Sequence, residues 1–528
     1  MRKLENEVIK LKHGDGMRTF LDDTIKISIG QFYGIEINDF AVTVAKTALW
    51  IAESQMMKET EEIVQTNLDF LPLKSYANII EGNALCIDWE AVCSKEKLSY
   101  IMGNPPFVGA RLMSTNQKED LLNVFGEKWK NVGNLDYVAC WYKKCAEFIN
   151  NSNIRCALVS TNSVSQGESV ANLWKPLFEN GVHIDFAHRT FRWDSEASVK
   201  AHVHCVIIGF STAVNVRPKI IYSDDRPQIA ENINAYLLNA ENIFIESRKK
   251  PVCSVAEMVF GSMPNDGGYL SDYTEEQKNE IIKKYPQTEK MFRPLLGAAE
   301  FINNKTRYCL WLKGIYPKEI QSIPPVLEAV RQVEKLRLES KREPTKKLAS
   351  VPMLFGEVRQ PESGNYLLIP STSSENRKYV PIGFLSHTII ASNANLLIPN
   401  ATLYEFGVLT SNVHNAWMRA VCGRLKSDYR YSASIVYNNF PWCEPTEEQK
   451  AKIEETAQAI LDARALYPDC SLSDLYGENM ILYTELLNAH RLNDKAVMEA
   501  YGFPVKNDFT ESMCVAKLMK IYQKLTSK

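Results

Sequence analysis

Long apolar runs, paired cysteines and a strong net charge are all missing from this sequence of 528 residues. No run approaches the roughly 18 apolar residues that a membrane-spanning helix needs. The basic start of the chain is followed by no apolar core of the kind found in secretory leaders. We therefore expect a cytoplasmic protein without a membrane partner. With 45% hydrophobic and 23% charged residues, the composition is that of globular domains and excludes wholesale disorder.

The twelve cysteines are scattered, and none form the C-x-x-C pairs from which zinc sites are built. We expect reduced thiols that pack as small hydrophobic side chains, and no metal site. The formal net charge of −2 excludes a uniformly basic coat for nucleic acid. A nucleic-acid partner would therefore need basic residues gathered on one face of the protein.

Strand-like and helical segments alternate through residues 1–215. Strands are expected at 31–37, 78–85, 100–107, 156–160, 183–187 and 202–210, and the clearest helices at 2–13, 40–57 and 136–150. This alternation predicts an α/β domain with a Rossmann-like, doubly wound parallel sheet. Two strands in quick succession near 183–210 predict an antiparallel hairpin at one edge of that sheet.

The amino-acid composition and pattern of the sequence change near residue 215. Residues 216–445 are dominated by proline, asparagine and short strand-like runs, and one long charged helix interrupts them from Pro325 to about Arg342. Residues 446–528 have helical periodicity again. We expect three domains, with an α+β domain at 216–445 and a small α-helical domain at 446–528.

The clearest chemical signal is Asn104-Pro105-Pro106-Phe107 at the end of a predicted strand. Two prolines fix φ at consecutive residues and remove two N–H donors, so the turn is rigid. The Asn104 side-chain carbonyl and the Pro105 main-chain carbonyl can both accept from an exocyclic NH₂, which exposes the nitrogen lone pair to an electrophile. Phe107 can stack on the base ring. The alternative is a proline turn with a capping asparagine and no chemistry.

Two more polar residues follow predicted strands. Glu36 ends one strand, at the place where Rossmann-like sheets hold ribose hydroxyls. The alternative for Glu36 is an acid favoured by the dipole of the helix that follows. Asn83, in the sequence Gly-Asn-Ala-Leu after the next strand, can hydrogen-bond an adenine edge or simply occupy a turn.

These three motifs, in this order, resemble those of the adenine-N6 DNA methyltransferases. The resemblance to the MmeI-type restriction–modification enzymes covers essentially the whole chain. It includes the segments 107–110, 133–138, 161–167, 201–207, 300–304, 429–432, 437–442 and 493–497. The resemblance implies a class I methyltransferase domain at 1–215, a target-recognition domain at 216–445 and a helical C-terminal domain at 446–528.

The resemblance further implies methyl transfer from S-adenosylmethionine to N6 of an adenine that is flipped out of duplex DNA. The reaction would belong to a restriction–modification or phage-defence system and needs no metal. The implied catalytic residues are Asn104, Pro105, Pro106 and Phe107, and the implied cofactor-binding residues are Glu36, Ile37, Asn83, Ala84 and Asn104. Cytosine N4, RNA and protein glutamine stay open as targets, because the turn suits any planar amine or amide.

One family motif has no match in this chain. The family carries a glycine-rich motif on its first strand, whose backbone cradles the methionine part of S-adenosylmethionine. Gly14-Asp15-Gly16 has no preceding strand and no third glycine. The sequence therefore leaves a second interpretation open, in which the chain is a catalytically silent fragment or DNA-specificity subunit. It would then need a separate N-terminal polypeptide carrying the nuclease or the missing motif.

Basic residues of the middle domain are expected to contact double-stranded DNA. Arg331, Lys335, Arg337, Lys341 and Arg342 gather in and just beyond the long charged helix, where they could contact phosphates. The alternative is a solvated helix face with acidic partners at i,i+4 spacing. Residues 216–445 carry a small excess of basic over acidic residues, as a DNA-binding domain requires.

A second group is expected to read bases. Glu375 and Arg377 lie two residues apart, so they share one side of the chain if this segment is extended. Arginine can read guanine O6 and N7, and glutamate can accept from cytosine N4. The alternative is a surface ion pair. Arg424 and Arg430 flank Tyr429 and are expected to touch the DNA backbone.

Overall fold

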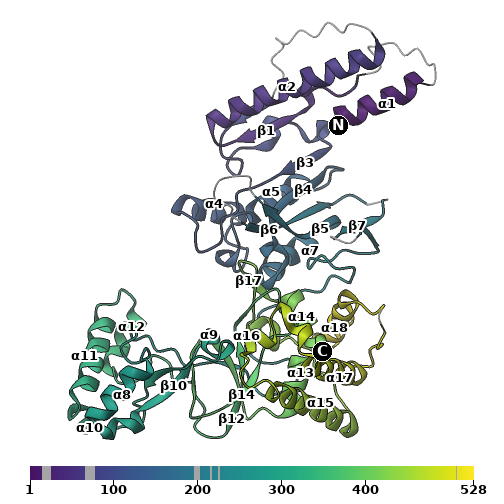
Figure 1. Cartoon of the computed structure of the whole chain (residues 1–528). Helices are drawn as coiled ribbons and strands as arrows, with labels where there is room; N and C mark the ends of the chain where they lie inside the picture. The colour runs from purple at the N-terminus through teal and green to yellow at the C-terminus, as the bar shows by residue number, and fades with distance from the viewer. Residues whose placement is uncertain are drawn as a thin grey trace. The chain divides into compact units, whose positions relative to one another are not determined.

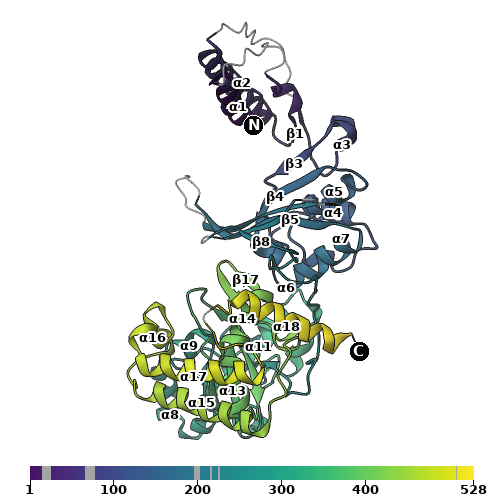
Figure 2. The same cartoon turned by 90° about the vertical axis from the view of Figure 1, so that its right-hand side faces the viewer.

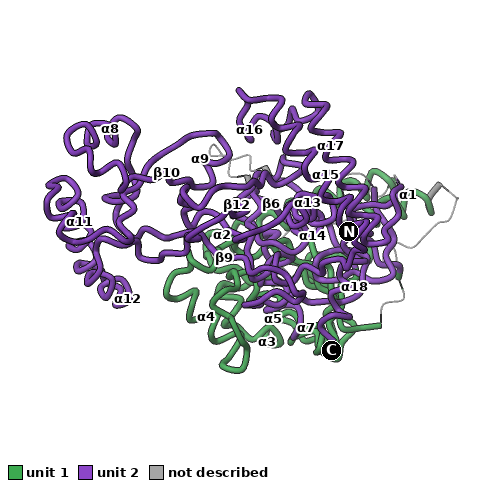
Figure 3. The backbone as a smooth tube through the Cα atoms, turned by 90° about the horizontal axis from the view of Figure 1, so that it is seen from below, with its two compact units in different colours: residues 1–160, 177–185, 207–217 green, residues 161–176, 186–206, 218–528 purple. Residues whose placement is uncertain are grey.

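The computed structural model describes residues 1–14, 25–65, 78–194, 202–214, 217–223, 226–506 and 508–527. Its chain divides into two compact units (Figure 3), of which unit 1 comprises residues 1–160, 177–185 and 207–217 and unit 2 the remainder. No helix in the described ranges is long and apolar enough to cross a bilayer. All twelve cysteines are free and eight of them are buried, which confirms their predicted use as small hydrophobic side chains.

Unit 1 begins with two helices and a two-stranded parallel sheet. The elements are α1 (Arg2–Gly14), β1 (Tyr33–Glu36), α2 (Asp39–Val64) and β2 (Asn78–Glu81). α1 packs along α2 (Figure 1), where Thr60 donates a hydrogen bond of 2.7 Å to the buried Asn6. Asn38 caps α2 by accepting from the amide of Ala41 at 3.0 Å. This cap lets the helix start directly after β1.

Six further strands form a mixed sheet in the order β3-β4-β6-β5-β7-β8. They are β3 (Tyr100–Gly103), β4 (Arg155–Thr161), β5 (His183–Asp194), β6 (His202–Ser211), β7 (Lys219–Tyr222) and β8 (Gln228–Ala230). β3 and β4 pair in parallel, as do β5 and β7, whereas β8 is antiparallel to β7. The intervening helices are α3 (Trp89–Val92), α4 (Thr115–Phe125), α5 (Ala139–Phe148), α6 (Gly167–Ser169) and α7 (Lys175–Glu179).

The predicted α/β class is confirmed, with one correction to the sheet. β5 and β6 do not form an edge hairpin, because β7 and β8 lie outside β5. The sequence pattern places residues 219–230 in the predicted middle domain (216–445), because a composition rich in proline and asparagine begins there. β7 nevertheless pairs with β5, and β8 pairs with β7. These pairings are tertiary contacts that no local pattern encodes.

One part of unit 2 is built on β10 and the helices around it (Figure 1). The elements are α8 (Glu275–Lys284), β10 (Phe292–Leu296), α9 (Ala298–Ile302), β11 (Arg307–Leu310), α10 (Pro317–Gln321), α11 (Pro324–Leu338) and α12 (Glu343–Lys347). Leu295 of β10 and Val333 of α11 belong to its apolar core. The long charged helix ends at Leu338, earlier than predicted, and Pro344 stands in the first turn of a new helix, a position that proline favours.

Two antiparallel sheets follow in unit 2, with strand orders β14-β12-β16-β9 and β13-β18-β17. The strands are β9 (Val259–Phe260), β12 (Asn365–Pro370), β13 (Thr372–Ser373), β14 (Gly383–Ser386), β16 (Asn395–Pro399), β17 (Gly423–Leu425) and β18 (Asp428–Arg430). A further short strand, β15 (Ile390–Ala391), pairs in parallel with β10. The predicted α+β character of the middle region is therefore confirmed.

Helices make up the end of the chain. They are α13 (Leu403–Thr410), α14 (Asn412–Val421), α15 (Glu447–Ala465), α16 (Leu472–Leu475), α17 (Thr484–Ala500) and α18 (Glu511–Thr526). α13, α15 and α17 lie side by side (Figure 2), and α13 approaches α15 closely at Gly407. Helices α15 to α18 confirm the helical periodicity predicted for residues 446–528. α13 is missed because it is buried nearly all round and so lacks an amphipathic pattern.

Candidate functional site

A cavity of about 720 Å³ in unit 1 lies where β1, β2 and β3 end. Its walls contain every predicted cofactor residue and three of the four predicted catalytic residues, namely Glu36, Ile37, Asn83, Ala84, Asn104, Pro105 and Pro106. Phe107 is not among the lining residues and is 36% exposed. The volume is in the range of small-molecule sites. Three motifs that are distant in the sequence thus meet at one cavity.

Asn83 is oriented by an acid that the sequence did not single out. Its side-chain amide donates to the Asp120 carboxylate at 3.0 Å, and its side-chain carbonyl accepts from the amide of Leu85 at 2.9 Å. The Tyr137 hydroxyl donates to the same Asp120 carboxylate at 2.6 Å, and burial raises the pKa of this phenol. Asp120 and Tyr137 both line the cavity. They hold the Asn83 amide in one orientation.

A lysine closes the turn that carries Asn83. The Lys144 ammonium of α5 donates to the main-chain carbonyls of Ala84, Leu85 and Ile87 at 2.7–2.8 Å. Burial lowers the pKa of this ammonium. Because three carbonyls converge on one cation, the turn after β2 is rigid.

The proline turn is followed by a loop that is tied to the start of α5. The amide of Ala110 donates to the Asp136 carboxylate at 3.0 Å, and the amide of Tyr137 donates to the Val108 carbonyl at 2.9 Å. Pro105 is buried and Asn104 is exposed. The turn is therefore anchored behind Asn104, which leaves that side chain accessible at the wall of the cavity.

Two open strand edges border the same cavity. Among the described strands, β1 pairs with β2 alone and β3 pairs with β4 alone. Residues of both edges line the cavity, and apolar side chains there are exposed, with Tyr33 at 39%, Tyr100 at 53% and Met102 at 77%. Such edges present unpaired N–H and C=O groups that another strand can satisfy.

The predicted base-reading residues lie in unit 2, next to the sheet β13-β18-β17. Glu375 pairs with Arg424 at 3.3 Å, and the Arg424 guanidinium lies 4.2 Å from the centre of the Tyr429 ring. Glu375 therefore faces Arg424. Burial lowers the pKa of Arg377, whose Nε is buried and has no hydrogen-bond partner within the described ranges. Arg430, at the end of β18, is exposed.

The basic residues in and just beyond α11 separate into two kinds. Arg331, Lys335, Lys341 and Arg342 are exposed, as phosphate contacts require. The prediction is wrong for Arg337, which is fully buried. It donates to five main-chain carbonyls at 2.8–3.2 Å, those of Pro264, Asn265, Leu348, Val351 and Leu354.

No group of three metal-ligating side chains occurs in the part of the chain that the structure describes.

Comparisons with known proteins cover the whole chain. Models of MmeI match in three parts, the DNA-methyltransferase domain at residues 1–223, the target recognition domain at 239–444 and the C-terminal domain at 445–528. DNA methyltransferase A of Bacillus subtilis (strain 168) is 39% identical over 506 residues, which is 95% of this chain. This chain spans only 57% of the length of that relative.

A solved structure is similar over the full chain. It is that of the type IIL restriction–modification enzyme MmeI in complex with DNA, which is 46% identical with a TM-score of 0.87. The alignment covers 100% of this chain and 70% of that chain.

Proposed function

Because this chain belongs to the MmeI family, as a methyltransferase domain followed by target-recognition and C-terminal domains, we propose that it methylates specific sites in duplex DNA. The target is N6 of an adenine flipped out of the stack. The reaction belongs to a restriction–modification system. The observation that carries the proposal is the single cavity at which Glu36, Asn83 and the Asn104 turn meet.

The residues of the cavity suit S-adenosylmethionine, which when bound supplies an electrophilic methyl group. A carboxylate at Glu36 suits ribose hydroxyls, and Asn83, held by Asp120, suits the edge of an adenine. Asn104 and the Pro105 carbonyl accept from the two N–H groups of the target amine, which directs its lone pair toward the methyl group. S-adenosylmethionine, when bound, would supply the methyl group and leave as the thioether, and the methylated amine would give up one proton to solvent. Phe107 stacks on the base.

Transfer of a labelled methyl group to DNA tests this proposal. Asn104→Ala should lower the rate by about 100-fold, as loss of one well-placed polar contact to the reacting group does, while the fold measured by circular dichroism is retained. Asn150→Ala is the matched control, because Asn150 is exposed and lies outside the cavity. RNA, protein and DNA substrates that offer only cytosine amines are assayed in parallel. Label on any of these in place of adenine would refute the assigned target.

The open edges of β1 and β3 favour a second candidate function, in which the chain depends on another polypeptide to bind its cofactor. We propose that a strand from a polypeptide segment outside these 528 residues pairs with both edges and completes the cofactor site. Without it, the chain would act as a DNA-specificity partner that does not bind S-adenosylmethionine. Calorimetry of the purified chain with S-adenosylmethionine decides between the two modes. Micromolar binding by the chain alone would show that the additional strand is dispensable.

A further inference from the structure

Two side chains anchor the segment that follows Glu375 to the helices at the end of the chain. Asn376 donates from its side-chain amide to Glu478 at 2.8 Å. Three residues later, the hydroxyl of the buried Tyr379 donates to the Asp494 carboxylate of α17 at 2.6 Å. Residues 376–379 are thus held at both ends by groups more than 100 positions away in the sequence.

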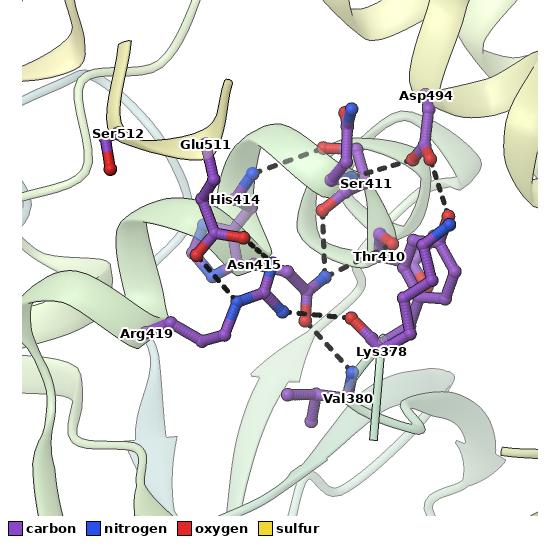
Figure 4. Close-up of polar contacts among 12 residues, drawn as sticks. Lys378, Val380, Thr410, Ser411, His414, Asn415, Arg419, Asp494, Glu511 and Ser512 are labelled. Atoms are coloured by element: carbon purple, nitrogen blue, oxygen red, sulfur yellow. Dashed lines mark hydrogen bonds and ion pairs between the residues drawn. The ribbon is translucent and has the colours of Figure 1, made fainter. Parts of the chain in front are cut away.

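The main chain of the same segment is anchored to α14. The carbonyl of Lys378 accepts from Arg419 at 3.0 Å, and the amide of Val380 donates to the side chain of the buried Asn415 at 3.0 Å (Figure 4). Arg419 is itself fixed by two hydrogen bonds to Glu511 at the start of α18, at 2.8 and 2.9 Å (Figure 4). Bidentate contacts of this kind restrict both the position and the orientation of a guanidinium.

Asp494 and Tyr379, which form one of these anchors, make further contacts that fix their own positions. Asp494 accepts a second hydrogen bond, from the amide of Asn412 at 2.7 Å, and the Tyr379 ring stacks on His490 with ring centres 4.2 Å apart. Arg377 differs from its neighbours, because its buried Nε has no hydrogen-bond partner in the described part of the chain. The segment is therefore rigid on both sides of Arg377, whose side chain is half-buried.

We propose that Tyr379 and Arg419 are positioning residues for sequence reading. They do not touch DNA. They fix the position and orientation of residues 375–377. Arg377 and Glu375 can then hydrogen-bond to base edges with the geometry that discrimination between bases needs. This inference rests on the proposed reading of DNA by unit 2 and assigns part of that specificity to α14, α17 and α18.

The test uses the full chain and a randomised duplex library, from which bound DNA is sequenced to give the preferred site. Affinities are then measured for that site and for sites with one base pair changed. Tyr379→Phe and Arg419→Ala should each reduce the discrimination between these sites about tenfold, the scale of one base contact. Arg419→Lys should restore part of it. Thr456→Val is the matched control for Tyr379→Phe, because it also removes one buried hydroxyl but touches no residue of the segment 375–380.

Three results are informative. If the wild-type chain selects no sequence, the proposed reading of DNA fails. If it selects a site, and both variants fold and keep the wild-type discrimination, the positioning inference is wrong while the proposed function stands. Equal loss of discrimination in Thr456→Val would also overturn the inference, because general destabilisation would then explain the effect. Reduced discrimination confined to the two anchor variants, with unchanged affinity for unrelated DNA, is the expected result.

Discussion

Replacing Asp494 by asparagine should make the protein more stable, and increasingly so as the pH rises. Burial raises the pKa of this carboxyl to about 6 in the folded chain, above its ordinary value in an unfolded chain. The folded state then binds the proton more tightly, so the carboxyl's contribution to stability is complete below about pH 4 and is lost as the pH rises through 6. The difference between the two pKa values corresponds to about 3 kcal/mol at pH 7.5.

Asp494→Asn has nearly the same shape and can keep both hydrogen bonds. The amide oxygen accepts from the main chain of Asn412, and the amide nitrogen can donate to the Tyr379 hydroxyl, which accepts as well as donates. We therefore expect the variant to match the wild type near pH 4. It should exceed the wild type by up to about 3 kcal/mol at pH 7.5.

Other buried groups titrate in the same range, so the difference between the two proteins is the quantity to measure. Burial lowers the pKa of His414 to about 3 and that of His490 well below its usual range. Both histidines destabilise the folded state as the pH falls below about 6.5, in wild type and variant alike. Taking the difference removes this shared contribution.

Urea unfolding of both proteins at half-unit steps from pH 4.5 to 8 gives the free energies of unfolding. Asp469→Asn serves as a control, because Asp469 is exposed in the same part of the chain. A stability difference between Asp494→Asn and wild type that does not change with pH would refute the raised pKa of Asp494.

Three further predictions concern the packing and the DNA surface. Arg337→Met should destabilise the folded chain by about 3–5 kcal/mol, because five main-chain carbonyls lose the donor that the buried guanidinium supplies. A urea midpoint equal to that of the wild type would contradict this. Gly407→Ala should cost about 1–3 kcal/mol, since a Cβ there would lie 2.7 Å from a methyl of Ile453, and thermal unfolding measures the loss. Substituting Lys335 and Arg342 together by alanine should weaken binding to all DNA sequences alike and reduce the salt slope of the affinity by about 2. An unchanged slope would show that Lys335 and Arg342 do not contact phosphates.

The site residues that could be predicted from the sequence are those that lie at the end of a strand. Glu36, Asn83 and Asn104 each follow a recognisable strand, and the ends of neighbouring strands are brought together by the fold. Asp120 and Lys144 were missed because their contacts join residues far apart in sequence, with 37 positions between Asp120 and Asn83. Nothing in the local pattern of α4 distinguishes Asp120 from a solvated acid.

Arg337 could have been recognised from its spacing. Ala329, Val333 and Arg337 recur every four residues, so the arginine continues the buried face of α11. The charged residues around Arg337 mask this periodicity in the sequence. The same limitation applies to α13, whose apolar residues carry no alternation, and its helical state depends on the neighbours α15 and α17 rather than on its own sequence.

The edges of β1 and β3 that lack a partner strand within the described residues also bear on how concentrated solutions of this chain should behave. An exposed strand edge beside exposed apolar side chains is a template for a second copy as well as for an intended partner. The isolated chain should therefore associate with itself as its concentration rises, through edge-to-edge pairing at Tyr33–Glu36 and Tyr100–Gly103. A peptide that pairs with these edges should then reduce this self-association. Light scattering would detect the effect without a catalytic assay.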